Sequence, residues 1–270
     1  MLFKIITIVG FMLISAITFS SERKYECMIE PKTVVDLGSA AQGVIEFVSA
    51  DRGQKVKKNE VIAKLVSNVE KAAVEVARAK VNGTAQQESA RIRKSFSERK
   101  YKRALDLSNK DHISVYELDE ARTEMFLAEQ ALAEADEYMT LAEAELKQAE
   151  ALMDLKVIKS PIDGVVINRY MEPGERVEND PIIQIAQINP LYVEVLLPVE
   201  MLGEVQLGHI GSVSSERKNG KNYMASVVAI DPVVNAASGF FGVRLSLPNP
   251  DLRIISGLEC EIEFLAESPN

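Results

Sequence analysis

Residues 160–185 read SPIDGVVINRYMEPGERVENDPIIQI, and they repeat a pattern that the chain has already used. Residues 39–64 read SAAQGVIEFVSADRGQKVKKNEVIAK, and the two copies align at a constant offset of 121 residues. Each copy reads as short strands with a glycine turn between them. One copy alone buries too little apolar surface to be stable, so we expect the two to close a small β-sandwich by pseudo-twofold pairing. The residues in register are Gly43 with Gly164, Gly53 with Gly174, Val56 with Val177, and Ile62 with Ile183.

The segment between the two copies is predicted to be helical. Residues 66–156 contain no proline and a single glycine, Gly83, and a stretch with so few helix breakers favours helix throughout. A heptad repeat in its second half predicts a supercoiled helix with a narrow apolar seam. Long side chains recur every seven residues, and alanines follow three positions later: Leu118, Met125, Leu132, Met139, Leu146 and Met153; Ala121, Ala128, Ala135, Ala142 and Ala149.

The first half of the segment is expected to pack against the second as an antiparallel coiled coil. Its own heptad positions are mostly small and can receive the leucine and methionine side chains of the other half. Its end is basic, whereas residues 116–150 hold eleven carboxylates against Arg122 and Lys147. Each arm would contain about 40 residues and extend ~60 Å. The heptad positions of the first half are Val69, Val76, Gly83, Ala90, Ser97 and Ala104.

The turn between the arms is predicted within residues 107–121, LSNKDHISVYELDEA. Asn109 and Asp111 are residue types that favour turns. Ser114 is a good N-cap for the second helix, and Glu117, three residues later, completes a capping box.

The N-terminus and the two cysteines indicate an exported protein. Residues 1–20, MLFKIITIVGFMLISAITFS, read as a signal peptide, with an uncleaved anchor as the alternative. The formal net charge of −9 gives no basic field that would favour nucleic acid. Cys27 and Cys260 lie in strand-like segments near the two ends. In an exported chain they are candidates for a disulfide, and two buried free thiols are the alternative.

The two repeats resemble the biotinyl/lipoyl carrier fold, cut in two by a helical hairpin. This arrangement is similar to the periplasmic adaptor, or membrane fusion protein, family of HlyD-like proteins and RND efflux pumps. Residues 189–208 (NPLYVEVLLPVEMLGEVQLG) and residues 225–264 resemble the family's β-barrel domain. In residues 102–121, Arg103, Leu107 and Ser114 have the spacing of the family's tip motif.

The resemblance implies an elongated α+β protein, in which an antiparallel coiled-coil hairpin is inserted into a split lipoyl domain that a β-barrel domain follows. It also implies a periplasmic adaptor between an inner-membrane RND-type transporter and an outer-membrane TolC-like channel. Arg103, Leu107 and Ser114 would dock the channel, and copies of the chain would form a ring, six in the family. The expected segments are a signal peptide (1–20), an N-terminal strand (21–33), lipoyl halves (34–65 and 157–188), a hairpin (66–156), a β-barrel (189–265) and a tail (266–270).

Some features depart from the family's pattern. Ser256-Gly257 and residues 237–240 stand where Pro-Gly-Met and a Thr-Arg-Thr-Phe-like run are common in the family. Only AESPN follows the last expected strand, so the membrane-proximal domain of many RND adaptors has no C-terminal chain to build it. An ABC-type exporter is therefore the alternative inner-membrane partner.

Neither an active site nor a cofactor or metal site is expected. His112 and His209 are far apart in the sequence, without metal-ligand spacing around them. Asp163 lies between Pro161 and Gly164 and is interpreted as a turn residue. A carrier domain would need a lysine in a tight turn between its halves, whereas Lys64 and Lys156 lead into and out of helices. The remaining alternative is a purely structural periplasmic coiled-coil protein.

Overall fold

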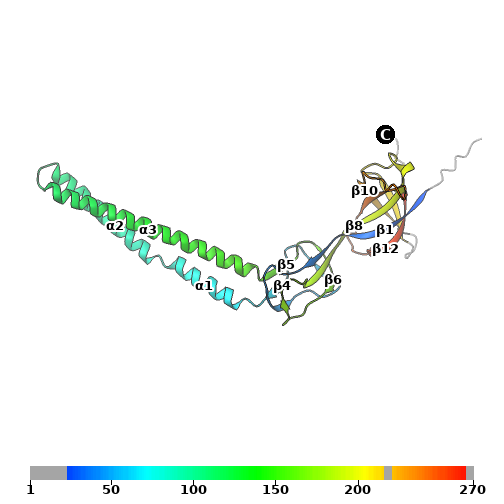
Figure 1. Cartoon of the computed structure of the whole chain (residues 1–270), viewed down its shortest axis with the longest axis horizontal. Coiled ribbons are helices and arrows are strands. Elements are labelled where there is room, and N and C mark those ends of the chain that lie inside the picture. Colours follow the sequence, from blue (N-terminus) through cyan, green and yellow to red (C-terminus); the bar gives the residue numbers. More distant parts are fainter. Residues whose placement is uncertain (1–22, 216–220, 266–270) are drawn as a thin grey trace, which may run out of the picture. The chain divides into compact units, whose positions relative to one another are not determined.

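The computed structural model describes residues 23–215 and 221–265 (Figure 1). The predicted signal peptide and tail lie outside the described residues. The described chain forms two compact units. The hairpin unit contains Thr33–Gln187, and the barrel unit contains the described residues up to Lys32 and those from Ile188 onward. The chain passes between the units twice, within β1 (Lys24–Leu37) and within β8 (Ile183–Pro198).

The barrel unit is built from antiparallel strands that bury every second side chain. The pairings run β1-β12-β9-β10-β11-β8, and β1 also pairs with β8, so the six strands form a closed ring. A period-two pattern of apolar residues turns one face of each strand inward. In β8 the buried residues are Leu191, Val193, Val195 and Leu197. The other elements are β9 (Ile210–Ser215), β10 (Asn222–Ile230), β11 (Phe240–Leu247), β12 (Leu258–Phe264) and the 3-10 helix η1 (Val199–Met201).

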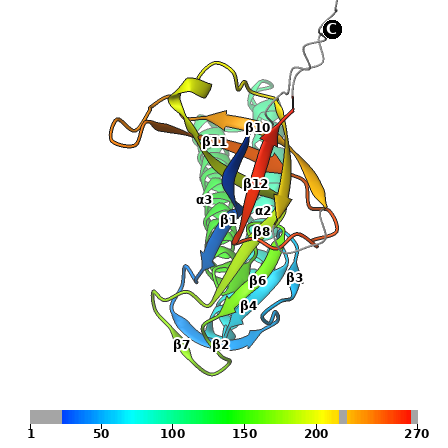
Figure 2. The same ribbon diagram turned by 90° about the vertical axis from the view of Figure 1, so that its right-hand side faces the viewer.

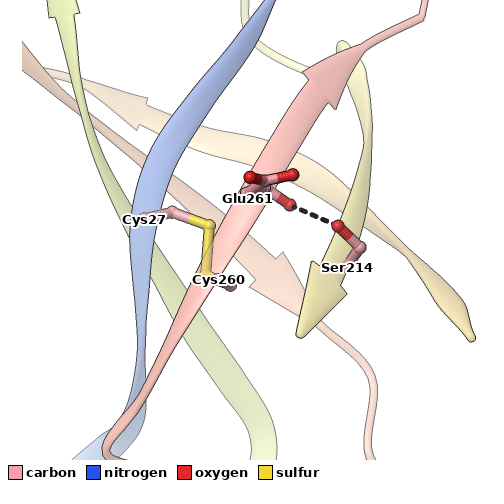
Figure 3. Close-up of a disulfide and its surroundings, with 4 residues drawn as sticks. All are labelled: Cys27, Ser214, Cys260 and Glu261. Atoms are coloured by element: carbon pink, nitrogen blue, oxygen red, sulfur yellow. Dashed lines mark hydrogen bonds between the residues drawn. A yellow bond between two sulfur atoms is a disulfide. The ribbon is translucent and has the colours of Figure 1, made fainter. Parts of the chain in front are cut away.

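A disulfide joins the first strand of the barrel to the last. Cys27 on β1 lies directly opposite Cys260 on β12 in the strand register, with Cα atoms 4.9 Å apart, and the two sulfurs are bonded (Figure 3). Both side chains are buried. On the other side of β12, the Ser214 hydroxyl of β9 donates to the Glu261 carbonyl at 3.5 Å (Figure 3). The N-terminal strand is thus held covalently in the barrel.

In the hairpin unit, the two sequence repeats exchange strands. Gly43 of β2 pairs with Val177 of β7, and Gly164 of β6 pairs with Val56 of β3. The first strand of each copy therefore pairs with the second strand of the other, which confirms the expected pseudo-twofold pairing. The strands are β2 (Gly43–Val48), β3 (Lys55–Val56), β4 (Val61–Leu65), β5 (Val157–Lys159), β6 (Gly164–Arg169) and β7 (Arg176–Val177).

The glycine turns of the two copies are equivalent. Gly53 donates its N–H to the Val166 carbonyl at 2.8 Å, and Gly174 donates to the Ile45 carbonyl at 2.9 Å. Both glycines have left-handed backbones, with φ of 85° and 94°. Glycine adopts this conformation without a Cβ clash, and this explains the conserved spacing between the two copies.

The constant offset of 121 residues is wrong beyond the turns. Ile62 packs with Val56 and Val166 in one small core, and its equivalent in the other core is Ile182, which packs with Val177 and Ile45. The offset therefore falls to 120, because the second copy has one residue fewer between its short strand and its return strand. A one-residue slip turns every later side chain to the opposite face. Ile183 accordingly matches Ala63, not Ile62.

The hairpin consists of α1 (Asn68–Asn82), α2 (Ala85–Ser108) and α3 (Val115–Asp154). The predicted helical first arm is present but bends at Gly83, where the chain leaves the helical pattern between α1 and α2. Gly83 donates to the Lys80 carbonyl at 3.1 Å, and Thr84 donates to the Asn82 carbonyl at 3.0 Å, so tighter turns replace the helical pattern. Glycine is among the least favourable residues in a helix interior.

The alanines of α3 form the buried seam of the hairpin. Ala121, Ala128, Ala135 and Ala142 are buried, whereas the leucines and methionines of the heptad repeat are half-buried beside them. On α2, Ser97 is buried and Ala90 and Ala104 are half-buried, as the small-residue pattern predicts.

The same pattern is wrong in α1. Val69 and Val76 are 79% and 61% exposed, and Val74 and Ala77 are buried instead. The break at Gly83 separates two helices, so a heptad phase read from α2 does not extend into α1.

Ion pairs between the arms establish their antiparallel order. As the residue numbers rise along the first arm, those of the acidic partners on α3 fall. Such exposed pairs orient helices more than they stabilise them. The pairs are Arg78–Glu150 at 3.0 Å, Lys80–Glu145 at 2.7 Å, Lys94–Glu129 at 3.5 Å and Lys100–Glu124 at 2.6 Å.

Candidate docking surface at the hairpin tip

The three residues of the predicted tip motif lie at the end of the hairpin that is farthest from the split β domain (Figure 1). Arg103 and Leu107 belong to the last two turns of α2, and Ser114 directly precedes α3. All three side chains are exposed, and Leu107 exposes 43% of its surface. The fold therefore brings the motif to one exposed end.

The backbone of the tip is closed by hydrogen bonds. His112 donates its N–H to the Leu107 carbonyl, and Asp111 donates to the Ser108 carbonyl, each at 3.0 Å. Asp111 has a left-handed backbone with φ of 58°, which aspartate tolerates better than most residues. These bonds form a Schellman motif that satisfies the last carbonyls of α2. The loop is thus a defined turn that presents Leu107 at its edge.

Ser114 and Glu117 form the predicted capping box. The Ser114 hydroxyl accepts the Glu117 N–H at 3.2 Å, and the Glu117 carboxylate accepts the Ser114 N–H at 2.8 Å. The backbone N–H and then the hydroxyl of Ser114 lower the pKa of Glu117 below its usual value. Because the Ser114 side chain is already bonded within the turn, its first role is to start α3.

Two exposed apolar residues at the same tip are not part of the sequence motif. Val115 and Tyr116, the first residues of α3, expose 82% and 77% of their surfaces. Their position just after a recognisable N-cap was the available signal, since the first turn of a capped helix at a hairpin end has no partner helix beside it. We define the tip surface as Arg103, Leu107, Ser114, Val115 and Tyr116.

Chemistry-bearing residues elsewhere are engaged in structural contacts. Lys156 pairs with Glu70 at 3.1 Å and donates to the Gln42 carbonyl at 2.9 Å, which fixes the base of the hairpin. Lys64 pairs with Glu46 at 3.0 Å. Neither junction lysine is presented in a tight turn.

The remaining candidates for chemistry are placed as follows. Asp163 accepts the Lys58 N–H at 2.8 Å, in agreement with a turn role. His112 lies in the hairpin unit and His209 in the barrel unit. Within the described ranges, no group of three or more His, Cys, Asp or Glu residues could hold a metal ion.

The barrel loops that depart from the family's pattern are closed by their own backbone. Asn235 accepts the N–H groups of Ala237 and Ser238 through its side-chain oxygen at 3.0 and 3.3 Å. Gly239 and Gly257 both have positive φ, and Gly257 donates to the Ile29 carbonyl at 2.6 Å. These turns are therefore ordered without the family's usual residues.

The outer face of the barrel carries a charged group beside apolar side chains. Arg244 pairs with Glu194 on the neighbouring strand and lies 5.0 Å from the centre of the Tyr192 ring. The Glu194 carboxylate raises the pKa of Arg244. Leu196, two residues beyond Glu194 on the same strand, is 66% exposed. Among the described helices, none is both long and apolar enough to span a membrane.

Each of the two units matches the model of a known protein family. Residues 33–187 match the family described as the CzcB-like, barrel-sandwich hybrid domain, and residues 190–268 match the CusB-like, beta-barrel domain. The chain is 27% identical over 173 residues to the multidrug resistance protein MdtE of Escherichia coli, a match that covers 58% of this chain and 43% of MdtE. It is 22% identical over 238 residues to an uncharacterized protein of Haemophilus influenzae, covering 86% and 54% of the two chains. The chain thus spans about half, or less, of the length of these relatives.

Solved structures share the fold. The structure of MacA from Actinobacillus actinomycetemcomitans superposes with a TM-score of 0.75 at 22% identity, over 90% of this chain and 78% of that one. The membrane fusion protein Spr0693 from Streptococcus pneumoniae superposes with a TM-score of 0.60 at 16% identity, over 91% and 100% of the two chains. Because the barrel-sandwich hybrid match alone covers more than half of the residues, this protein belongs to the CzcB-like family of periplasmic adaptor, or membrane fusion, proteins, whose members are not enzymes.

Proposed function

We propose that this chain is the periplasmic adaptor of a tripartite efflux pump, which couples an inner-membrane RND-type transporter to an outer-membrane TolC-like channel. The observation that carries the proposal is the exposed tip surface at the end of a capped helical hairpin, in a chain of the membrane fusion family. The mechanism is assembly: the chain binds partners at its surfaces and performs no chemical step.

The tip surface is the proposed contact with the channel. Leu107 supplies an apolar anchor, and an anchor of this kind contributes most when the contact buries it fully. Arg103 lies four residues before Leu107, which places both side chains on the same face of α2. Ser114 sets the start of α3 and thereby positions Val115 and Tyr116 beside the turn.

We further propose that copies of the chain form a ring, with coiled-coil hairpins side by side. The outer face of α3 supports contact between copies, because large side chains remain exposed along it. Tyr116, Leu127 and Tyr138 recur every eleven residues, a spacing that returns to nearly the same side of a helix after three turns. Their exposed fractions are 77%, 66% and 49%.

The barrel, residues 189–265, is the proposed contact with the transporter. The chain's relative MdtE is named as a multidrug resistance protein, and this supports a role in efflux. The same architecture would also serve an ABC-type exporter. The identity of the inner-membrane protein that the barrel captures distinguishes these two partners.

The proposal is tested by Leu107→Asp, with Ile92→Asp as its control. Both residues are exposed on the first arm, at 43% and 61%, but Ile92 lies in α2 about four turns before the tip. Substitutions at exposed positions usually change the free energy of unfolding by no more than about 0.5 kcal/mol, so both variants should fold.

We expect Leu107→Asp to abolish efflux in a strain that depends on this adaptor, whereas Ile92→Asp retains it. Full efflux by Leu107→Asp at normal protein levels would contradict docking through the tip surface.

A further inference from the structure

The two turns related by the pseudo-twofold of the split β domain have the same backbone but opposite charge. We name residues 51–60 the basic turn and residues 172–181 the acidic turn. Asp51 donates its N–H to the Gln54 side chain at 2.8 Å, and the equivalent Glu172 donates to the Glu175 side chain at 2.9 Å. The two turns thus share a hydrogen-bond pattern.

The basic turn presents unpaired cations. Its four basic side chains are exposed, and they take part in none of the ion pairs found among the described residues. The nearby carboxylates accept backbone N–H groups: Asp51 from Arg52, Glu60 from Lys57 and Asp163 from Lys58. The four basic side chains are therefore available to pair with carboxylates of another molecule. The four residues are Arg52, Lys55, Lys57 and Lys58.

The acidic turn has the opposite charge balance, with four carboxylates, Glu172, Glu175, Glu178 and Asp180, against Arg176. Lys57 corresponds to Glu178 at the offset of 121 residues. Glu178 pairs with Arg176 at 3.2 Å, while the Asp180 side chain is exposed and has no ion pair among the described residues. A shallow depression in this turn is lined by Tyr170, Met171, Glu175, Arg176, Asp180 and Pro181. An extended lysine side chain from another molecule could enter it.

The two turns adjoin edge strands of different sheets. Within this unit, β3 ends the order β8-β6-β3, and β7 ends the order β5-β4-β2-β7. Figure 2 shows β3 and β7 on different sides of the domain. A ring with cyclic symmetry requires two different surfaces of each subunit that fit one another. The two turns supply such a pair, because they adjoin different sheet edges and carry opposite charge.

We propose that the basic turn of one copy docks onto the acidic turn of the next copy around the ring. This inference rests on the self-association in the proposed function, and it names the surfaces that set the direction of the ring. Complementary charges contribute mainly to the specificity and rate of association. The contact therefore orients neighbouring copies head to tail and disfavours head-to-head pairs.

Variants with one added cysteine, in which Cys27 and Cys260 remain bonded to each other, test the contact in the full-length chain in cells. Two differently tagged chains, one carrying Lys57→Cys and the other Asp180→Cys, are co-expressed and treated with a short bismaleimide. We expect a mixed product that contains both tags. Products with one tag only, Lys57→Cys to Lys57→Cys or Asp180→Cys to Asp180→Cys, would overturn the proposal because they require a symmetric contact.

A general amine crosslinker on the unaltered chain tests ring formation separately from the docking of the two turns. Oligomers with this reagent, combined with no mixed bismaleimide product, would overturn the docking of the turns while the ring stands. The absence of oligomers with either reagent would overturn both.

Charge reversal supplies an independent measurement. Lys57→Glu with Lys58→Glu is expected to remove most of the crosslinked oligomer, and adding Glu178→Lys with Asp180→Lys in the same chain should restore it. Glu75→Lys on α1, an exposed acidic position outside both turns, is the matched control and should have no effect. Failure of the fourfold variant to recover, with its fold intact, would contradict the inference.

Discussion

The barrel and the helical hairpin are stabilised in different ways. The barrel core contains large side chains that are almost fully buried, such as Phe241, Leu245 and Ile262, and a disulfide joins its first and last strands. The hairpin buries alanines and a serine in its seam, while large apolar side chains such as Leu127 stay exposed. The barrel therefore buries most of its large apolar side chains within itself. The hairpin leaves large apolar side chains exposed, where other molecules can contact them.

The difference reflects what each region is proposed to do. A closed strand ring has no long unpaired edge and can hold a fixed shape by itself. A helix pair with a small-residue seam brings its two backbones close together and keeps its larger side chains outside. The barrel's stability should thus depend on its core and disulfide, and the hairpin's on the size of its seam residues.

The largest effect on stability is expected from removing the disulfide. In Cys27→Ala with Cys260→Ala, we expect the free energy of unfolding of the barrel to fall by about 2–5 kcal/mol, as is typical of native disulfides. Urea unfolding, followed by tyrosine fluorescence, measures the change. The unaltered protein in a strong reductant serves as the control and should approach the variant. Equal stability of the variant and the oxidised protein would show that the barrel does not depend on its covalent bond.

A smaller effect is expected in the seam of the hairpin. Ala135→Leu places a large side chain where α3 meets the first arm, and overpacking of this kind costs about 1–3 kcal/mol. Ala133→Leu is the matched control, because Ala133 is exposed on the same helix. Thermal unfolding followed by helical circular dichroism should separate the two variants. If they melt alike, the seam does not require small residues, and the contrast with the barrel is lost.

The smallest effect is expected at the cap of α3. Ser114→Ala should cost about 1 kcal/mol, as for other N-caps. It should raise the pKa of Glu117 only part of the way toward its usual value, because the backbone N–H of residue 114, the larger cause of the lowered pKa, remains. Folding lowers the pKa of Glu117, so the ionised carboxylate stabilises the helix above the usual glutamate pKa. This stabilisation is lost as the pH falls through the lowered pKa. The carboxyl titration of Glu117 by NMR measures the shift. An unchanged pKa in the variant would contradict the hydrogen bond from the Ser114 hydroxyl to Glu117.

Much of the fold could be predicted from local patterns. The glycine turns, the strand exchange between the repeats and the cap at Ser114 each follow from residue types at fixed spacing, and the structure confirms them. At the candidate site, the placement of Arg103, Leu107 and Ser114 at one exposed end also follows from the position of the turn. Their role in docking stays a prediction.

Two errors have physical causes that the sequence alone conceals. Ile182 and Ile183 are adjacent and identical, so only packing reveals which one matches Ile62. Val69 and Val76 continue a heptad rhythm across Gly83, but the helix does not continue with it. Val115 and Tyr116 lie before the first heptad position, Leu118, so the repeat predicts nothing about their exposure.

The central claim is that the tip surface docks an outer-membrane channel. The most direct test is in-cell photo-crosslinking from a reactive residue at Lys110, which is exposed in the turn, whereas Ser114 is needed for the cap. We predict capture of a TolC-like outer-membrane channel, identified by mass spectrometry, and loss of this product when Leu107→Asp is added. Capture of the chain itself alone, or of nothing, at normal expression would contradict the claim and favour a structural periplasmic hairpin.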